Sequence, residues 1–168
     1  AREEAAPGSL DTVTTSATPA VGPGVHVTRT DANSVRLATE YELTPRNFSA
    51  FLAAADSLGA LAARDSVARA HLSANLSDAG ASDVDAGVKW LESDSLSSRA
   101  INSAGISVRD YFVESIAIAA AERFLGNPGA APPTPALEKN AEFLRSRKTE
   151  LARLHELEAG RPVVTIKP

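Results

Sequence analysis

The stretch that decides the fold is SVRDYFVESIAIAAAERFL, residues Ser107–Leu125, the longest strongly apolar segment of the chain. Ser107 followed by Asp110 has the spacing of a capping box, which satisfies early backbone N–H groups at a helix start. Gly126 and Pro128 then stop the helix. The apolar positions cover most of the helix circumference: Val108, Phe112, Ile116, Ala120 and Phe124, beside Tyr111, Ile118 and Leu125. This pattern predicts a buried helix at the centre of a bundle.

A membrane-spanning helix is the alternative for the same stretch. A span needs about 20 mostly apolar residues, whereas this one carries Asp110, Glu114, Glu122 and Arg123. Charged side chains at this density disfavour a bilayer environment. Glu114 and Glu122 instead fall on a narrow polar row, so we expect them to be solvated or salt-bridged. Buried carboxylates are the less favoured interpretation.

Composition extends the helical prediction to the rest of the chain. The chain has 168 residues, of which 43% are hydrophobic and only 5% aromatic. Much of the apolar content is alanine, which favours helix, and β-branched runs are few. We therefore expect an all-α fold, a compact bundle of about four to six helices around the helix at 107–125.

Net charge and two missing residue types limit the function classes. The formal net charge of −4 disfavours nucleic-acid binding, which requires a basic face. The absence of cysteine excludes disulfides and thiol chemistry. The chain also has no methionine and starts with the small, polar segment AREEAAPGSLDTVTTSATPA. This start is typical of the region after a signal-peptide cleavage site, so we expect an exported, periplasmic protein; a chain trimmed at this point is the alternative.

The chain divides into three predicted parts: an extended, linker-like arm at 1–43, a helical domain at 44–160 and an extended tail at 161–168. Residues 1–24 contain almost no large apolar side chains and cannot bury enough surface to order themselves. Val25–Thr28 fits a short extended piece. Ser34–Leu43 fits either a strand or a helix.

Within the domain, local signals predict where helices begin and end. Thr44-Pro45 and Thr134-Pro135 are both N-cap and N1 pairs. The first helix breaks or restarts at Asp65 or Ser66. The second Thr-Pro pair opens a last helix that runs to about residue 159.

Two shorter helices are expected between these longer ones. One lies within 84–91, capped by Ser82 or Asp83, and contains Trp90, the only tryptophan, as an anchor between elements. The other covers Ser95–Ala104 with Leu96 and Ile101 facing inward, and is closed by Gly105.

No pattern of catalytic, metal-binding or cofactor-binding residues is evident, and we expect none of these sites. The histidines lie far apart in unlike contexts, and we expect each at the surface or at a boundary: His26, His71 and His155. Asp83, Asp85 and Asp94 suggest a calcium loop, but Val88 stands where that loop requires glycine.

The candidate partner-binding residues lie near the two ends of the chain. The basic cluster Arg145, Arg147 and Lys148 is usually a solvated helix face, and alternatively docks an acidic partner or lipid headgroup. The tail VVTI has high β-propensity and suits pairing along a partner surface. The apolar candidates in the two end segments are Val25, Val27, Val163, Val164 and Ile166.

Three segments carry a resemblance to a known group of proteins: YELTPRNFSAFLAAADSL (Tyr41–Leu58), AGISVRDYFVESIAIAAAERF (Ala104–Phe124) and LEKNAEFLRSRKTELARL (Leu137–Leu154). In this order they resemble small exported helical proteins of envelope-bearing bacteria. One member type that the chain looks like is a membrane-extrinsic subunit on the periplasmic side of a photosynthetic reaction-centre–light-harvesting complex. The resemblance implies a structural role, with no catalytic residues to carry over.

The leading functional hypothesis is therefore a non-enzymatic, membrane-extrinsic accessory subunit that docks on and stabilises a bacterial membrane protein complex. The alternative is a free periplasmic module that binds a small apolar ligand between alanine-rich helices. An enzyme is the third hypothesis, because acid–base pairs can form from carboxylates that are distant in sequence.

Overall fold

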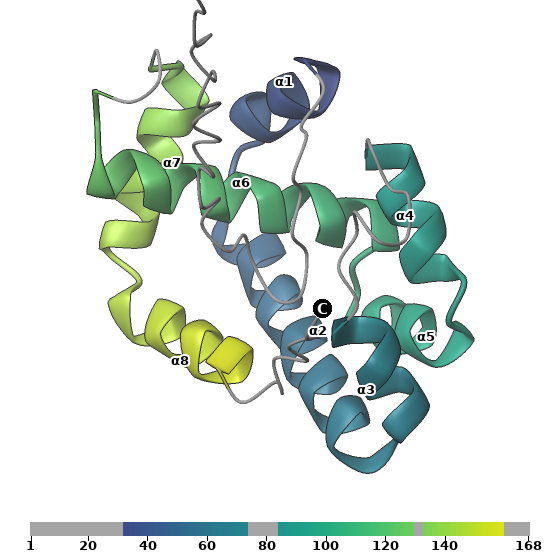
Figure 1. The fold of residues 1–168 in the computed structure, drawn as a ribbon. Helices are drawn as coiled ribbons and strands as arrows, with labels where there is room; N and C mark the ends of the chain where they lie inside the picture. Colours follow the sequence, from purple (N-terminus) through teal and green to yellow (C-terminus); the bar gives the residue numbers. More distant parts are fainter. Residues whose placement is uncertain (1–31, 74–83, 130–132, 160–168) are drawn as a thin grey trace, which may run out of the picture.

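The computed structural model describes residues 32–73, 84–129 and 133–159, and these residues form eight α-helices with no strand among them (Figure 1). The predicted all-α class is confirmed. The helices are more numerous than the four to six expected, because residues 32–40 of the predicted arm form a helix and the predicted last helix is divided in two. Their bounds are α1 (Ala32–Glu40), α2 (Pro45–Arg64), α3 (Ser66–Ser73), α4 (Val84–Glu92), α5 (Ser95–Ser103), α6 (Val108–Gly126), α7 (Pro135–Arg145) and α8 (Lys148–Ala159).

The starts of the longer helices follow the predicted capping residues. Thr44 and Asn47 form a reciprocal capping box at the start of α2, with Pro45 at its first position. The Ser107 hydroxyl accepts the backbone N–H of Asp110 at 3.0 Å at the start of α6. Thr134 caps α7 in the same way. These local signals therefore fix where the long helices begin.

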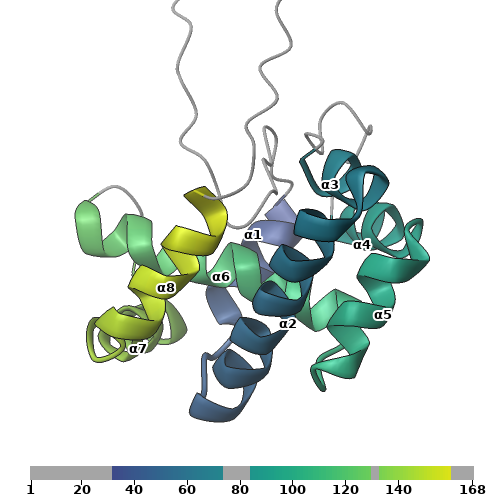
Figure 2. The same ribbon diagram turned by 90° about the horizontal axis from the view of Figure 1, so that it is seen from below.

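Helices α2 and α6 cross in the body of the molecule, and the other helices are arranged around them (Figures 1 and 2). Helix α6 contacts α1, α2, α4, α5 and α7. Phe51 of α2 stacks on Tyr111 of α6, with ring centroids 4.7 Å apart. Both rings are almost completely buried, so the crossing lies within the hydrophobic core.

Gly87 allows a close approach between helices, whereas Gly59 leaves room for a Cβ at an ordinary van der Waals distance. A Cβ built on Gly87 of α4 would lie 2.2 Å from Cζ of Phe112 on α6, far inside contact distance. A Cβ on Gly59 of α2 would lie 3.4 Å from a methyl group of Leu157 on α8. Because Gly87 has no side chain, the Phe112 ring packs directly against the backbone of α4.

The predicted extended arm at 1–43 is wrong over its last residues, because α1 covers Ala32–Glu40 and packs against α6 and α7. The backbone N–H of Tyr41 continues the helical bonding by donating to Leu37 at 3.0 Å. Leu37 and Tyr41 both pack against the core. They are four residues apart, so they lie on one helix face, and the helical interpretation of this ambiguous segment holds.

The predicted single last helix is also wrong, because it is divided between α7 and α8. The Ser146 hydroxyl bonds to the backbone carbonyl of Phe143 at 2.7 Å, and the Ser146 backbone adopts the last helical turn. The same bond from the Ser115 hydroxyl to the carbonyl of Phe112 lies inside the unbroken helix α6, so this bond alone does not end α7. The leucine spacing continues across the break and conceals it.

Leu96 is the one predicted inward residue of α5 that points outward, with 40% of its surface exposed. The buried face of α5 carries Ser97 and Ile101. Residues five positions apart point about 140° away from each other on a helix, so Leu96 and Ile101 cannot share a face. Gly105 does close the helix, with a φ of 84°.

Some predictions fall on residues outside the described ranges, namely the structures of 1–31 and 160–168 and the cap at Ser82 or Asp83. Among the described helices, none is long and apolar enough to cross a membrane.

Candidate functional site

The predicted partner-binding residues divide into two sets. Arg145, Arg147 and Lys148 lie together where α7 ends and α8 begins. The five apolar candidates lie outside the described residues: Val25, Val27, Val163, Val164 and Ile166. The structure therefore gathers the basic candidates, and the apolar ones stay predictions.

We call Phe143, Arg145, Arg147 and Lys148 the basic corner. Arg145 pairs with Glu142 at 2.5 Å, and Arg147 pairs with Glu150 at 3.2 Å. The Arg147 guanidinium also lies over the Phe143 ring, 5.3 Å from its centroid. Two of the three predicted cations thus already pair with exposed carboxylates three residues away in the chain.

Glu114 of α6 is the functional candidate that the sequence pattern misplaced. It was expected on a solvated row, but its side chain is completely buried. One carboxyl oxygen, Oε2, accepts a hydrogen bond from the Tyr41 hydroxyl at 3.1 Å. The other oxygen, Oε1, is buried and has no hydrogen-bond partner in the described part of the chain. Glu114 is therefore a carboxyl group in the core with half of its bonding capacity unused.

The surroundings of Glu114 disfavour its charged form. Burial raises the pKa of the Glu114 carboxyl to about 8, the hydrogen bond from Tyr41 offsets part of this increase, and the nearby Asp110 carboxylate adds to it. No ion pair involves Glu114 within the described ranges. At neutral pH the group is therefore mostly a neutral carboxylic acid.

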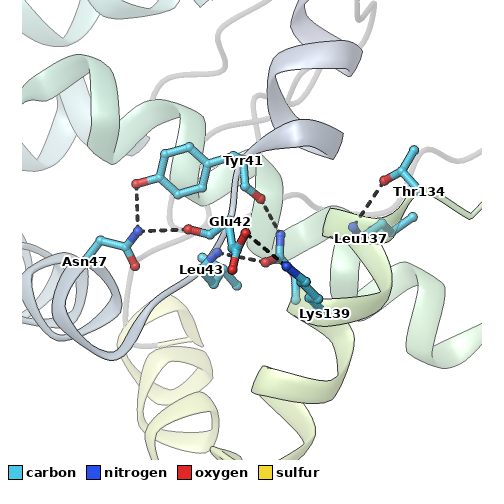
Figure 3. A network of polar contacts seen from close by, with 8 residues as sticks. Tyr41, Glu42, Leu43, Asn47, Thr134, Leu137 and Lys139 are labelled. Carbon is cyan, nitrogen blue, oxygen red and sulfur yellow. Dashed lines mark hydrogen bonds and ion pairs between the residues drawn. The ribbon is translucent and has the colours of Figure 1, made fainter.

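Tyr41 belongs to the extended linker at 41–44 between α1 and α2, which is held by side-chain bonds (Figure 3). The Asn47 amide donates to the Tyr41 hydroxyl at 3.3 Å and to the Glu42 carbonyl at 3.1 Å. Burial, and then the proximity of Glu114, raise the pKa of the Tyr41 hydroxyl well above its ordinary range. The hydroxyl therefore stays protonated and donates to Glu114 throughout the physiological pH range.

Asn140 of α7 holds the other side of this linker. Its side-chain oxygen accepts the backbone N–H of Leu43 at 2.8 Å, and its side-chain N–H donates to the carbonyl of Tyr41 at 2.7 Å. Asn140 and Leu43 are both buried. The amide thus bonds to alternate residues of an extended segment as a neighbouring strand would. An all-helical packing satisfies the buried backbone of the linker in this way.

The remaining polar candidates have structural partners. His71 of α3 stacks on Trp90 of α4 at 4.5 Å, so Trp90 does join two elements. His155 of α8 lies 2.7 Å from Glu122 of α6, which confirms that Glu122 is a paired surface group. Asp94 caps α5, and Asp85 pairs with Arg109 of α6.

Among the described residues, no group of three His, Cys, Asp or Glu side chains is arranged to hold a metal ion. The chemistry available at Glu114 is therefore proton uptake and release by one buried carboxyl beside a permanently protonated phenol. No local motif signals this site, because Tyr41, Glu114 and Asn140 meet only through tertiary packing.

Comparison with known proteins found no matching family model, no matching curated sequence and no matching solved structure. The resemblance to exported helical subunits accordingly stays a prediction.

Proposed function

We propose that this chain is a non-catalytic, membrane-extrinsic accessory subunit that docks on a bacterial membrane protein complex, with the basic corner as part of its docking surface. The observation that carries the proposal is that three basic residues lie at the junction of α7 and α8, where the Arg147 guanidinium lies over the ring of the partly buried Phe143. A reaction-centre–light-harvesting complex is the first partner to test, because the sequence resemblance suggests it.

The composition of the basic corner suits a protein interface. Arginine and aromatic side chains are enriched at interface centres, where a ring supplies apolar area and a guanidinium binds carboxylates. The intramolecular partners Glu142 and Glu150 are themselves accessible to solvent. Exposed ion pairs of this kind contribute little to stability, so carboxylates of a partner can replace them at low cost.

Apolar packing attaches the basic corner to the rest of the body, with an exposed ion pair beside it. Arg153 of α8 makes two bonds to the Asp56 carboxylate of α2, at 3.3 and 2.8 Å. Leu154 is almost completely buried beside them. Phe143 contacts Phe48 of α2 edge to face, with centroids 5.4 Å apart. A surface that is ordered before binding loses less conformational entropy on docking.

The test is co-purification of the full chain with complexes from detergent-solubilised membranes. We compare wild type with the charge-reversed triple variant Arg145→Glu, Arg147→Glu and Lys148→Glu. The matched control reverses two exposed arginines and one exposed lysine elsewhere: Arg46→Glu, Lys89→Glu and Arg99→Glu.

If the basic corner docks, its reversal lowers recovery of the complex at least tenfold, and the control variant keeps most of it. Equal loss in both variants would mean that only net charge matters. A wild-type chain that is recovered solely as a free monomer would overturn the docking function itself.

A further inference from the structure

Helix α1 and the linker at 41–44 together form a segment that we call the α1 clasp. Polar bonds fasten it to α7: the Thr134 hydroxyl donates to the carbonyl of Thr39 at 2.9 Å, and Asn140 makes two bonds to the linker backbone. An exposed ion pair joins Lys139 of α7 to Glu42 of the linker at 3.5 Å (Figure 3). The clasp is therefore attached at a few defined points.

The α1 clasp covers the buried carboxyl of α6. The Tyr41 ring brings its hydroxyl to Glu114, and Glu114 has no solvent exposure in this arrangement. Among the residues that the structure describes, no cation faces Glu114: the linker contributes the Tyr41 hydroxyl, α2 contributes the neutral Asn47 amide behind it, and α6 itself contributes Asp110. A negative charge on Glu114 would thus be buried without a counter-ion.

We infer that the α1 clasp is a pH-dependent latch, seated on α6 while Glu114 is protonated and released when Glu114 loses its proton. An unpaired carboxylate in a protein core is strongly unfavourable, because burial removes its hydration. Release of the clasp moves Tyr41 away from Glu114 and lets water reach the carboxylate again.

The α1 clasp is the element whose movement hydrates Glu114 most easily. Helix α1 has nine residues, stands at one end of the described body and packs mainly against α6 and α7. Short elements that contact few others, as α1 does within the described ranges, open at lower free energy than the body of a domain. Movement of α2 or α6 would instead disrupt the core stack of Phe51 on Tyr111. This inference holds whether or not the basic corner docks on a partner.

The test uses the two tyrosines of the chain, Tyr41 and Tyr111, as reporters. The full chain is labelled with ring-¹³C tyrosine, the two NMR signals are assigned with Tyr111→Phe, and spectra are recorded from pH 6 to pH 9. Because the ordinary pKa of a tyrosine hydroxyl is about 10, even a released Tyr41 stays mostly protonated over this range, and a change in its signal mainly reports its surroundings. We expect the Tyr41 signal to move towards solvent-exposed values as the pH rises from 6 to 9 while the Tyr111 signal stays in place.

The size of the effect follows from the proton affinity of Glu114 in the seated and released states. The equilibrium constant for release should rise on the order of 100-fold between pH 6 and pH 9. Glu114→Gln, which has the shape of the protonated acid, should keep Tyr41 seated at every pH. Glu156→Gln, the same change at an exposed site on α8, should behave as wild type.

Three outcomes would overturn the latch: a Tyr41 signal that does not change with pH in wild type, a transition that persists in Glu114→Gln, or a Tyr111 signal that moves together with that of Tyr41. If Glu114→Gln does not fold, the pH dependence of the Tyr41 signal in wild type and in Asn140→Ala tests the latch instead. Asn140→Ala removes two fastening bonds and should lower the pH of release by about one unit or more. An unchanged release pH in Asn140→Ala would also refute the latch.

Discussion

Replacement of Glu114 by glutamine should remove most of the pH dependence of stability between pH 5 and pH 8. In the folded chain burial raises the pKa of this carboxyl to about 8, against an ordinary value of 4.5. Between these values the folded state retains a proton that the unfolded state has lost. Stability therefore is highest at the acidic end, falls as the pH rises through this window, and levels off above about pH 8.

The magnitude follows from the proton linkage. Each pH unit inside the window lowers the free energy of unfolding by about 1.4 kcal/mol. Over the whole window the free energy of unfolding falls by roughly 3 to 5 kcal/mol, which is a large part of the total stability of a typical domain. Glutamine retains an oxygen to accept the Tyr41 hydroxyl and carries no charge at any pH. The variant should therefore match wild type within about 1 kcal/mol at pH 5 and exceed it clearly at pH 8.

The assay is urea unfolding followed by the fluorescence of Trp90, the only tryptophan, at pH 5, 6, 7 and 8. The difference between wild type and Glu114→Gln cancels the contribution of other titrating groups. Glu156→Gln serves as the control for removal of an exposed carboxylate. If the wild-type and Glu114→Gln stabilities run parallel from pH 5 to pH 8, Glu114 is not a buried protonated acid and the reasoning fails.

Three further predictions concern packing, backbone satisfaction and capping, each measured by urea unfolding at pH 6. Gly87→Ala places a methyl group against the Phe112 ring and should destabilise the fold by about 1 to 3 kcal/mol. Gly126→Ala, where nothing lies within 4 Å, should not destabilise it. Equal effects of the two substitutions would exclude the close crossing as the cause. Asn140→Ala leaves a buried backbone N–H and C=O without their bonds and should lower stability by about 2 to 4 kcal/mol, so a loss below about 0.5 kcal/mol would count against its strand-like role. Thr44→Ala removes the α2 cap and should lower stability by about 1 kcal/mol, with Thr44→Ser as the control that restores it.

The sequence predicts the helix starts well because their physical cause is local. Thr44, Ser107 and Thr134 each cap a helix within three residues of themselves. The same signals recur in many chains because a helix terminus must satisfy its own backbone groups. Helix class and most helix boundaries can therefore be read from short windows of sequence.

The position of Glu114 could not be predicted from such windows. Its helical row suggested exposure, but the residue that buries it, Tyr41, lies 73 positions away in the chain. Whether a polar position on a nearly all-apolar helix faces water depends on which distant segment covers it. The break between α7 and α8 was also missed, because the leucine pattern runs across it without interruption.

The strand-like bonding of Asn140 has a consequence for the order in which the chain folds. The bonds from Asn140 to Leu43 and to Tyr41 span 97 and 99 residues of sequence. Closing so large a loop is entropically unfavourable until the intervening helices have shortened it. The side chains that bind this segment, Glu114 and Asn140, lie on two different helices, α6 and α7. They are therefore in place only after these helices have packed together. We therefore expect the first described helix of the chain to be among the last to reach its native position, and substitutions in it to change the unfolding rate far more than the folding rate.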